Sequence, residues 1–126
     1  MAVGTDNRLF ERVEGELAVR YSPQGSDREY CGTTKNISGG GIRMPLLKKM
    51  DPGTVLDLEI FKYDTSLRAR CRGKIVWVWD EPMNKEAEQY FEAGVQFIDR
   101  QLLYIGRLMK YLEDQNRLFD DTEQLV

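Results

Sequence analysis

The amino-acid sequence predicts a mainly β domain, a small antiparallel sheet or barrel followed by one amphipathic helix. Two patterns indicate this fold class. Through most of the chain, short segments in which apolar and polar residues alternate are separated by turn signals. Near the carboxyl end the apolar spacing changes to three and four residues, which is typical of a helix. The 126 residues suffice for one domain with a single hydrophobic core.

The alternating segments are the predicted strands. In the first of them, apolar side chains from Val13 to Tyr21 fall on one face, and mostly charged side chains fall on the other. The sequences PQGSDRE and DPGT are turn signals between neighbouring strands. A short charged stretch, 84–92, is predicted to form a helical turn before the last strand. The strands are expected at 13–22, 30–38, 41–45, 55–61, 67–79 and 93–98.

The longest predicted strand, 67–79, has two chemically different faces. Its basic face is expected to be a solvated outer surface, because long cationic side chains lie well over a sheet with their charges in water. Its other face, which includes Trp77 and Trp79, is expected to point into the core. The basic face consists of Arg68, Arg70, Arg72 and Lys74.

The helix is predicted over residues 99–119, with Asp99 as its N-cap and an acidic tail at 120–126. The apolar residues that define it stand at 98, 102, 105, 109 and 112. Packing of this face on the domain's own sheet is favoured, because the heptad pattern is too short for a convincing coiled coil. Pairing with a second copy stays open, so the protein is expected to be a monomer or a homodimer.

The composition excludes several function classes. The chain has no histidine, so it cannot build a Ser-His-Asp or Cys-His catalytic arrangement, and it lacks the commonest metal ligand. Cys31 and Cys71 have neither metal-ligand nor redox spacing and are expected to be reduced residues in or near the core. We therefore expect no catalytic residues, no metal and no cofactor. With no signal peptide or membrane span, a cytoplasmic location is expected.

The sequence TTKNISGGGIRM places an amide, a hydroxyl and three consecutive glycines between two strands. One interpretation is a hairpin turn that needs a positive φ, with Asn36 and Ser38 making local side-chain-to-backbone hydrogen bonds. The other interpretation is a ligand site, in which bare backbone amides and these two side chains contact a molecule that comes close. Charge favours an anion here, because residues 1–50 are net positive while the rest of the chain is net negative.

A second motif precedes the first strand. Arg8 and Arg12 stand four residues apart in RLFER, and Asn36, Ser38 and Gly41 follow in NISGGG. This pair of motifs, R-x-x-x-R and then (D/N)-x-S-x-x-G, resembles the PilZ domain family. The later segments GKIVWVW and AGVQFID, followed by an amphipathic helix, are similar to that family's closing strands and C-terminal helix. The resemblance covers about residues 7–113.

The resemblance implies a six-stranded antiparallel PilZ-type β-barrel with a C-terminal α-helix. It divides the chain into a flexible N-terminal segment at 1–12, a barrel at 13–98, the helix at 99–119 and the tail at 120–126. It also implies binding of the bacterial second messenger cyclic di-GMP. The nucleotide-binding residues carried over are Arg8, Arg12, Asn36, Ser38 and Gly41, with Asn7, Gly39, Gly40 and Trp77 as further candidates.

The chemistry of the ligand suits these residue types. Guanidinium groups can hold phosphate oxygens or the O6 and N7 atoms of guanine. Asn7 occupies the position where some relatives carry an extra arginine and hold two nucleotides, so the number of nucleotides bound stays open. The expected function is a cyclic di-GMP receptor that changes conformation and signals through a protein partner, without contacting a membrane.

Two alternatives remain. One is a PilZ-like adaptor that binds a protein without nucleotide, although such members usually lack the arginines. The other is an oligonucleotide-binding barrel that uses the basic face of strand 67–79 with tryptophans as a stacking surface. Nucleic acid is disfavoured because the net charge is −3 and the tryptophans are expected on the opposite strand face.

Overall fold

The computed structural model describes residues 13–79, 81–85, 88–99 and 101–125. These residues form seven strands and one helix. The strands are β1 (Val13–Pro23), β2 (Tyr30–Ile37), β3 (Gly41–Leu46), β4 (Val55–Phe61), β5 (Arg68–Val78), β6 (Met83–Lys85) and β7 (Glu88–Asp99), and the helix is α2 (Leu102–Leu125). The predicted mainly β fold with a C-terminal helix is confirmed.

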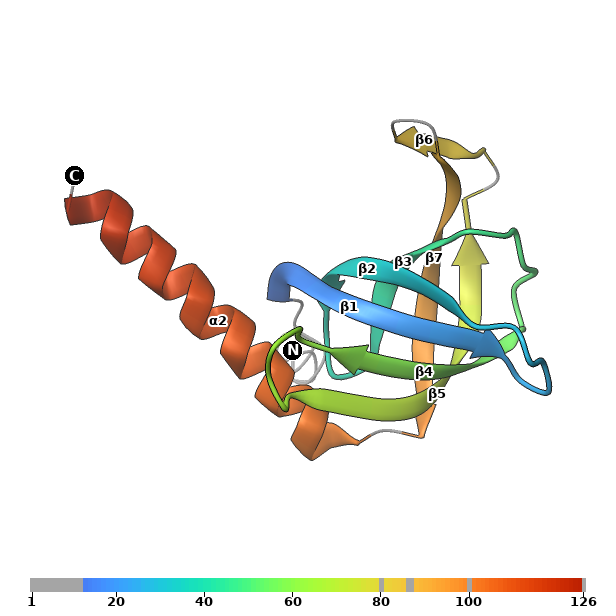
Figure 1. The fold of residues 1–126 in the computed structure, drawn as a ribbon, viewed down its shortest axis with the longest axis horizontal. Coiled ribbons are helices and arrows are strands. Elements are labelled where there is room, and N and C mark those ends of the chain that lie inside the picture. Colours follow the sequence, from blue (N-terminus) through green and yellow to red (C-terminus); the bar gives the residue numbers. More distant parts are fainter. Residues whose placement is uncertain (1–12, 80, 86–87, 100, 126) are drawn as a thin grey trace, which may run out of the picture.

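All strand pairings are antiparallel, and the order across the sheet is β3-β2-β1-β4-β5-β7-β6. Because β3 also pairs with β7, the sheet closes on itself, and the strands curve around a common core (Figure 1). Among the described strands, β6 pairs with β7 alone, from Met83 opposite Tyr90 to Lys85 opposite Glu88, and lies outside the closed part of the sheet. The described residues form seven strands rather than the predicted six, and the helical turn predicted at 84–92 is wrong, because the described residues of this segment belong to the paired strands β6 and β7.

The core lies inside the closed sheet and is built by the alternation read from the sequence. In β1 the side chains of Leu17, Val19 and Tyr21 are each 1% exposed, whereas Arg20 is exposed. The hydroxyl of Tyr21 accepts a hydrogen bond from the Leu47 amide at 2.9 Å, which satisfies its polar end inside the core. Burial raises the pKa of Tyr21, so this phenol stays neutral.

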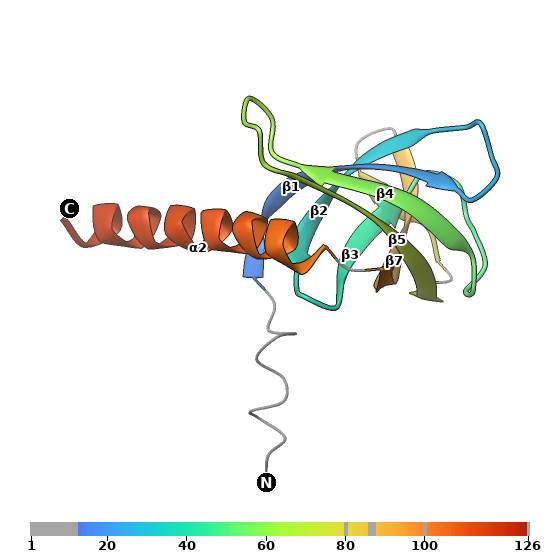
Figure 2. The ribbon, with the colours of Figure 1, turned by 90° about the horizontal axis from the view of Figure 1, so that it is seen from below.

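Helix α2 covers one end of the sheet and contacts β1 and β5. Among the helix side chains whose burial is described, Ile105, Leu108 and Leu112 are buried, and the Asn116 amide donates to the Glu14 carbonyl at 3.0 Å. The favoured packing on the domain's own sheet is confirmed for this part of the helix. The later turns extend away from the sheet (Figures 1 and 2). No helix in the described ranges combines the length and apolarity needed to cross a bilayer.

The ends of the helix differ from the prediction. Asp99 is the last residue of β7 rather than the N-cap, and its carboxylate accepts hydrogen bonds from the backbone amide and the Nε of Arg72. These hydrogen bonds extend the pairing of β5 with β7 as far as Asp99, so the helix begins three residues later, at Leu102. At its other end α2 runs to Leu125, so residues 120–125 of the predicted tail at 120–126 are helical.

Candidate functional site

The glycine-rich connection between β2 and β3 is closed by Ser38. Its side chain is buried at 3% exposure, and its Oγ accepts hydrogen bonds from the backbone amides of Gly40 and Gly41, each at 3.2 Å. The Ser38 amide donates to the Gly41 carbonyl at 2.9 Å. The local hydrogen bonding expected of Ser38 in a turn is therefore present. The expected positive φ is not, because the described glycines with positive φ are Gly15, Gly25 and Gly53.

The absence of a side chain at Gly41 has a tertiary cause. Gly41 pairs with Gln96 of β7, and a Cβ at Gly41 would lie 2.2 Å from the Val95 carbonyl oxygen. The turn is tied to β7 a second time, since the Phe97 amide donates to the Gly40 carbonyl at 2.9 Å. Gly41 therefore lets β3 approach β7 closely, which is the contact that closes the sheet.

A row of residues runs across the outer face from this turn. Asn36 of β2 pairs with Arg43 of β3, Arg43 pairs with Gly94 of β7, and Gly94 pairs with Trp77 of β5. At the β2 end the buried Thr34 hydroxyl lies 2.8 and 2.7 Å from the Asn36 and Arg43 carbonyl oxygens, which share its single proton. Four strands thus bring the second motif and Trp77 to one surface.

Trp77 lies outside the core, contrary to its predicted position. The register of β5 against β7 shifts between Ile75 and Trp77, so Val76 and Trp77 both become exposed, Trp77 at 40%. Such a bulge inserts one residue and turns the following side chain to the other face. The indole then lies on Gly94, where a Cβ would be only 2.1 Å from its Nε1 atom. Trp79, also predicted to be inward, is 58% exposed.

Arg43 completes this surface. Its guanidinium carbon lies 5.8 Å from the centre of the Trp77 ring, within cation–π range. Its Nε pairs with Glu92 Oε2 at 3.1 Å, and the Glu92 side chain is only 12% exposed. A nearly buried carboxylate therefore holds a cation beside an accessible aromatic ring. Such a surface suits a ligand that combines negative charge with flat rings.

The predicted site residues divide into two groups. Ser38, Gly39 and Gly40 form the β2–β3 connection, with Asn36 near the end of β2 and Gly41 at the start of β3, and the row described above brings Trp77 to the face of Asn36. Asn7, Arg8 and Arg12 lie outside the described residues. Sequence reasoning missed Glu92 and Gly94, whose positions depend on pairing between strands that are distant in the chain. The glycine in AGVQF, within a strand, was the available signal of a close approach.

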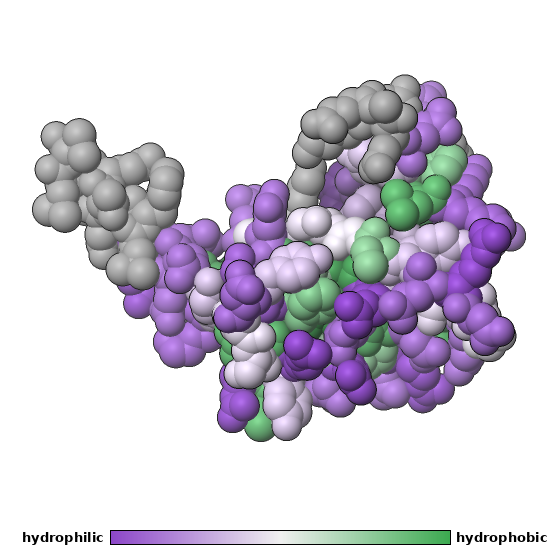
Figure 3. Space-filling view, in the orientation of Figure 1, coloured by the Kyte–Doolittle hydropathy of each residue, from purple (hydrophilic) through white to green (hydrophobic). Residues whose placement is uncertain are grey.

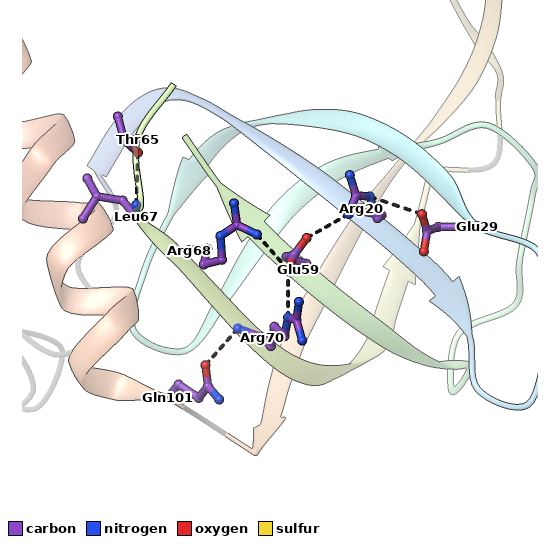
Figure 4. Close-up of polar contacts among 8 residues, drawn as sticks. All are labelled: Arg20, Glu29, Glu59, Thr65, Leu67, Arg68, Arg70 and Gln101. Carbon is purple, nitrogen blue, oxygen red and sulfur yellow. Dashed lines mark hydrogen bonds and ion pairs between the residues drawn. The ribbon is translucent and has the colours of Figure 1, made fainter. Parts of the chain in front are cut away.

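The basic face of β5 has a different character. Hydrophilic side chains cover most of the surface over β1, β4 and β5 (Figure 3). Arg68 and Arg70 of this face, together with Arg20 of β1, converge on Glu59, whose side chain is 10% exposed and pairs with Arg20 at 3.0 Å, Arg70 at 2.8 Å and Arg68 at 3.7 Å (Figure 4). The hydrogen bond from Arg70 is the main cause that lowers the pKa of Glu59. Much of this positive charge is therefore neutralised within the fold, as expected of a solvated outer face.

The two cysteines also have different surroundings. Both are free thiols, Cys71 in the core and Cys31 exposed, so the prediction of a core or near-core position is wrong for Cys31. Burial raises the pKa of Cys71 to about 12, which makes it inert at neutral pH.

Comparison with known proteins identifies the fold. The chain resembles the PilZ domain with c-di-GMP of YcgR from Escherichia coli, with a TM-score of 0.68 and 12% identity over 90% of this chain and 97% of that one. It resembles MotI, an inhibitor of motility from Bacillus subtilis, with a TM-score of 0.64 and 18% identity over 86% of this chain and 51% of that one.

A third solved structure is PlzA of Borreliella burgdorferi in complex with c-di-GMP, with a TM-score of 0.60 and 12% identity over 90% of this chain and 53% of that one. The chain thus spans about half the length of MotI and PlzA. No curated protein sequence is significantly similar to it. The sequence profile of the PilZ domain matches residues 6–114, and the chain therefore belongs to the PilZ domain family.

Proposed function

We propose that this protein is a receptor for cyclic di-GMP, without enzymatic activity, that binds the nucleotide beside the β2–β3 connection and signals through a protein partner. One observation carries the proposal. Val13, the residue that follows Arg12 in the sequence, pairs with Ile37, which stands between Asn36 and Ser38. The first described residue of the chain therefore enters the sheet next to the second motif, which supports our proposal that Arg8 and Arg12 act together with that motif. The solved PilZ domains of YcgR and PlzA that contain c-di-GMP support the choice of ligand.

Each motif has a proposed role that follows from its chemistry. Arg8 and Arg12 bind phosphate and guanine, because guanidinium offers forked donors to both. Asn36 contacts a guanine edge, which needs a donor and an acceptor together. Gly39, Gly40 and Gly41 let the nucleotide approach the backbone, with Ser38 holding the connection in shape. Trp77 offers an exposed ring on which a base can stack.

We further propose one nucleotide per chain, since Asn7 offers no additional guanidinium at the position next to Arg8. Ligand binding holds the segment that carries Arg8 and Arg12 against the β2–β3 connection. The ordered segment creates a surface that the ligand-free protein does not present. A partner protein that binds this surface preferentially transmits the signal. This mechanism requires no covalent bond to be made or broken, so the proposed activity is binding alone.

Calorimetric titration with cyclic di-GMP tests the proposal. The wild-type protein should bind at micromolar concentration or tighter, Arg12→Ala should lose binding, and Arg70→Ala should retain it because Arg70 pairs with Glu59 on another part of the sheet. Absence of heat from the wild-type protein would refute the proposal and favour the adaptor. Binding that ignores Arg12 and falls in Arg70→Ala would favour the basic face of β5 and an oligonucleotide ligand.

A further inference from the structure

We infer that Arg43 is a specificity-determining residue of the proposed site, and that it recognises the O6 and N7 edge of a guanine stacked on Trp77. The inference rests on the proposed function and deepens it, because it assigns the choice of base to a residue outside the two motifs. Four observations carry it: the register of Arg43, its ion pair with Glu92, its position beside Trp77, and the exposure of that ring.

The strand register fixes where Arg43 stands. It lies opposite Asn36 on one side and Gly94 on the other, and Gly94 is also opposite Trp77. Its neighbours Ile42 and Met44 are buried, so Arg43 projects from the outer face. The Arg43 guanidinium therefore lies between Asn36 and the Trp77 indole in this row.

Glu92 determines which donors of Arg43 remain available. The carboxylate takes the Nε hydrogen, while the Arg43 side chain as a whole stays 54% exposed. Within the described part of the chain, its two terminal nitrogens have no hydrogen-bond or ion-pair partner. Both can donate in parallel to one ligand edge, because the guanidinium is planar and its fork is rigid. A nearly buried anchor also lowers the conformational entropy lost when the ligand binds.

Guanine matches this pair of donors and adenine does not. Guanine presents two acceptors, O6 and N7, to such a fork, whereas adenine presents the N6 amino donor beside N7. The Trp77 ring, backed by Gly94 and 40% exposed, supplies the stacking surface alongside. Two other described rings have arginine neighbours. Phe61, beside Arg20 and Arg68, is only 8% exposed and so is unsuited to a base. Tyr104, beside Arg107, is exposed but lies on helix α2 and not in the row.

The experiment compares cyclic di-GMP with cyclic di-AMP as calorimetric ligands of the full chain. The variants are Arg43→Ala, Arg43→Lys and the matched control Arg72→Ala. Arg72 also pairs through its Nε with a carboxylate, that of Asp99, at 2.9 Å. It is not a residue of the row, because it pairs with β7 at Asp99 rather than at Gly94, so its removal should leave the proposed site intact. Circular dichroism and thermal unfolding establish that each variant is folded before titration.

We expect Arg43→Ala to bind cyclic di-GMP about tenfold or more weakly while its affinity for cyclic di-AMP changes less, because a bidentate guanine contact is lost. Arg43→Lys keeps the charge but not the fork and should lose most of the same preference. Arg72→Ala should keep the wild-type ratio of the two affinities. Trp77→Leu should weaken both ligands, since either base can stack on an indole.

The outcomes distinguish this inference from the proposed function. If the wild-type protein binds cyclic di-GMP through Arg12 but Arg43→Ala keeps the wild-type affinity and ratio, the role of Arg43 is refuted and the receptor stands. Equal losses for both ligands in Arg43→Ala would also refute it, because the residue would then supply only charge. If the wild-type protein does not bind cyclic di-GMP, the proposed function itself fails.

Discussion

The substitution Gly41→Ala tests why the second motif ends in glycine. A Cβ at this position would lie 2.2 Å from the Val95 carbonyl oxygen and 3.3 Å from the Cα of Gln96, both backbone atoms of β7. Real Cβ contacts shorter than 3.0 Å are essentially absent, so β3 and β7 must separate by about 1 Å. No side-chain rotation can relieve the contact. The structure therefore predicts a loss of stability in the absence of any nucleotide.

The size of this loss follows from the packing around the added methyl group. Overpacking against a rigid neighbour costs about 1–3 kcal/mol. A weakened ladder hydrogen bond adds about 1 kcal/mol, so we expect a decrease of about 3 kcal/mol in the free energy of unfolding. For a chain of 126 residues this corresponds to a fall in Tm of about 10 °C.

Urea unfolding followed by circular dichroism measures this change, and Gly106→Ala provides the control. A Cβ at Gly106, inside α2, would meet nothing within 4 Å, so the change should stabilise the protein by about 1 kcal/mol through helix propensity. If Gly41→Ala unfolds within about 0.5 kcal/mol of the wild type, the close approach of β3 and β7 is not what requires glycine there.

Three further results are expected. The pKa values of Glu59 and Asp99 are lowered, chiefly by hydrogen bonds from Arg70 and Arg72 respectively. The stability that these ionised carboxylates contribute is therefore complete above about pH 4.5 and is lost as the pH falls through the lowered pKa values. When the free energy of unfolding is measured at a series of pH values, Glu59→Gln should lose less stability in acid than the wild type. Ellman's reagent should modify Cys31 rapidly in the native protein and Cys71 only on unfolding, and equal native rates would contradict the assigned burial. The affinity for cyclic di-GMP should weaken as salt rises because two phosphates are neutralised, and a salt-independent Kd would contradict the arginine roles.

Much of the candidate site could be predicted because its motifs are local. Asn36, Ser38 and the glycines stand next to one another in the chain, and Ser38 makes the short-range hydrogen bonds that such a sequence favours. Glu92 and the exposed position of Trp77 could not be predicted in the same way. Both depend on the register of β7 against β3 and β5, and one inserted residue at Val76 reverses the face on which Trp77 lies.

The sequence by itself determined the fold class, most of the strands and, apart from the end of β5, their buried faces, because a period of two residues is a local property of the chain. Only the tertiary structure decided that the sheet closes through β3 and β7, that β6 forms, and that Asp99 clamps Arg72 instead of beginning the helix. These features depend on contacts between residues far apart in the sequence. Their free energies are set by which strands meet and in what register, and no local pattern of residues specifies that.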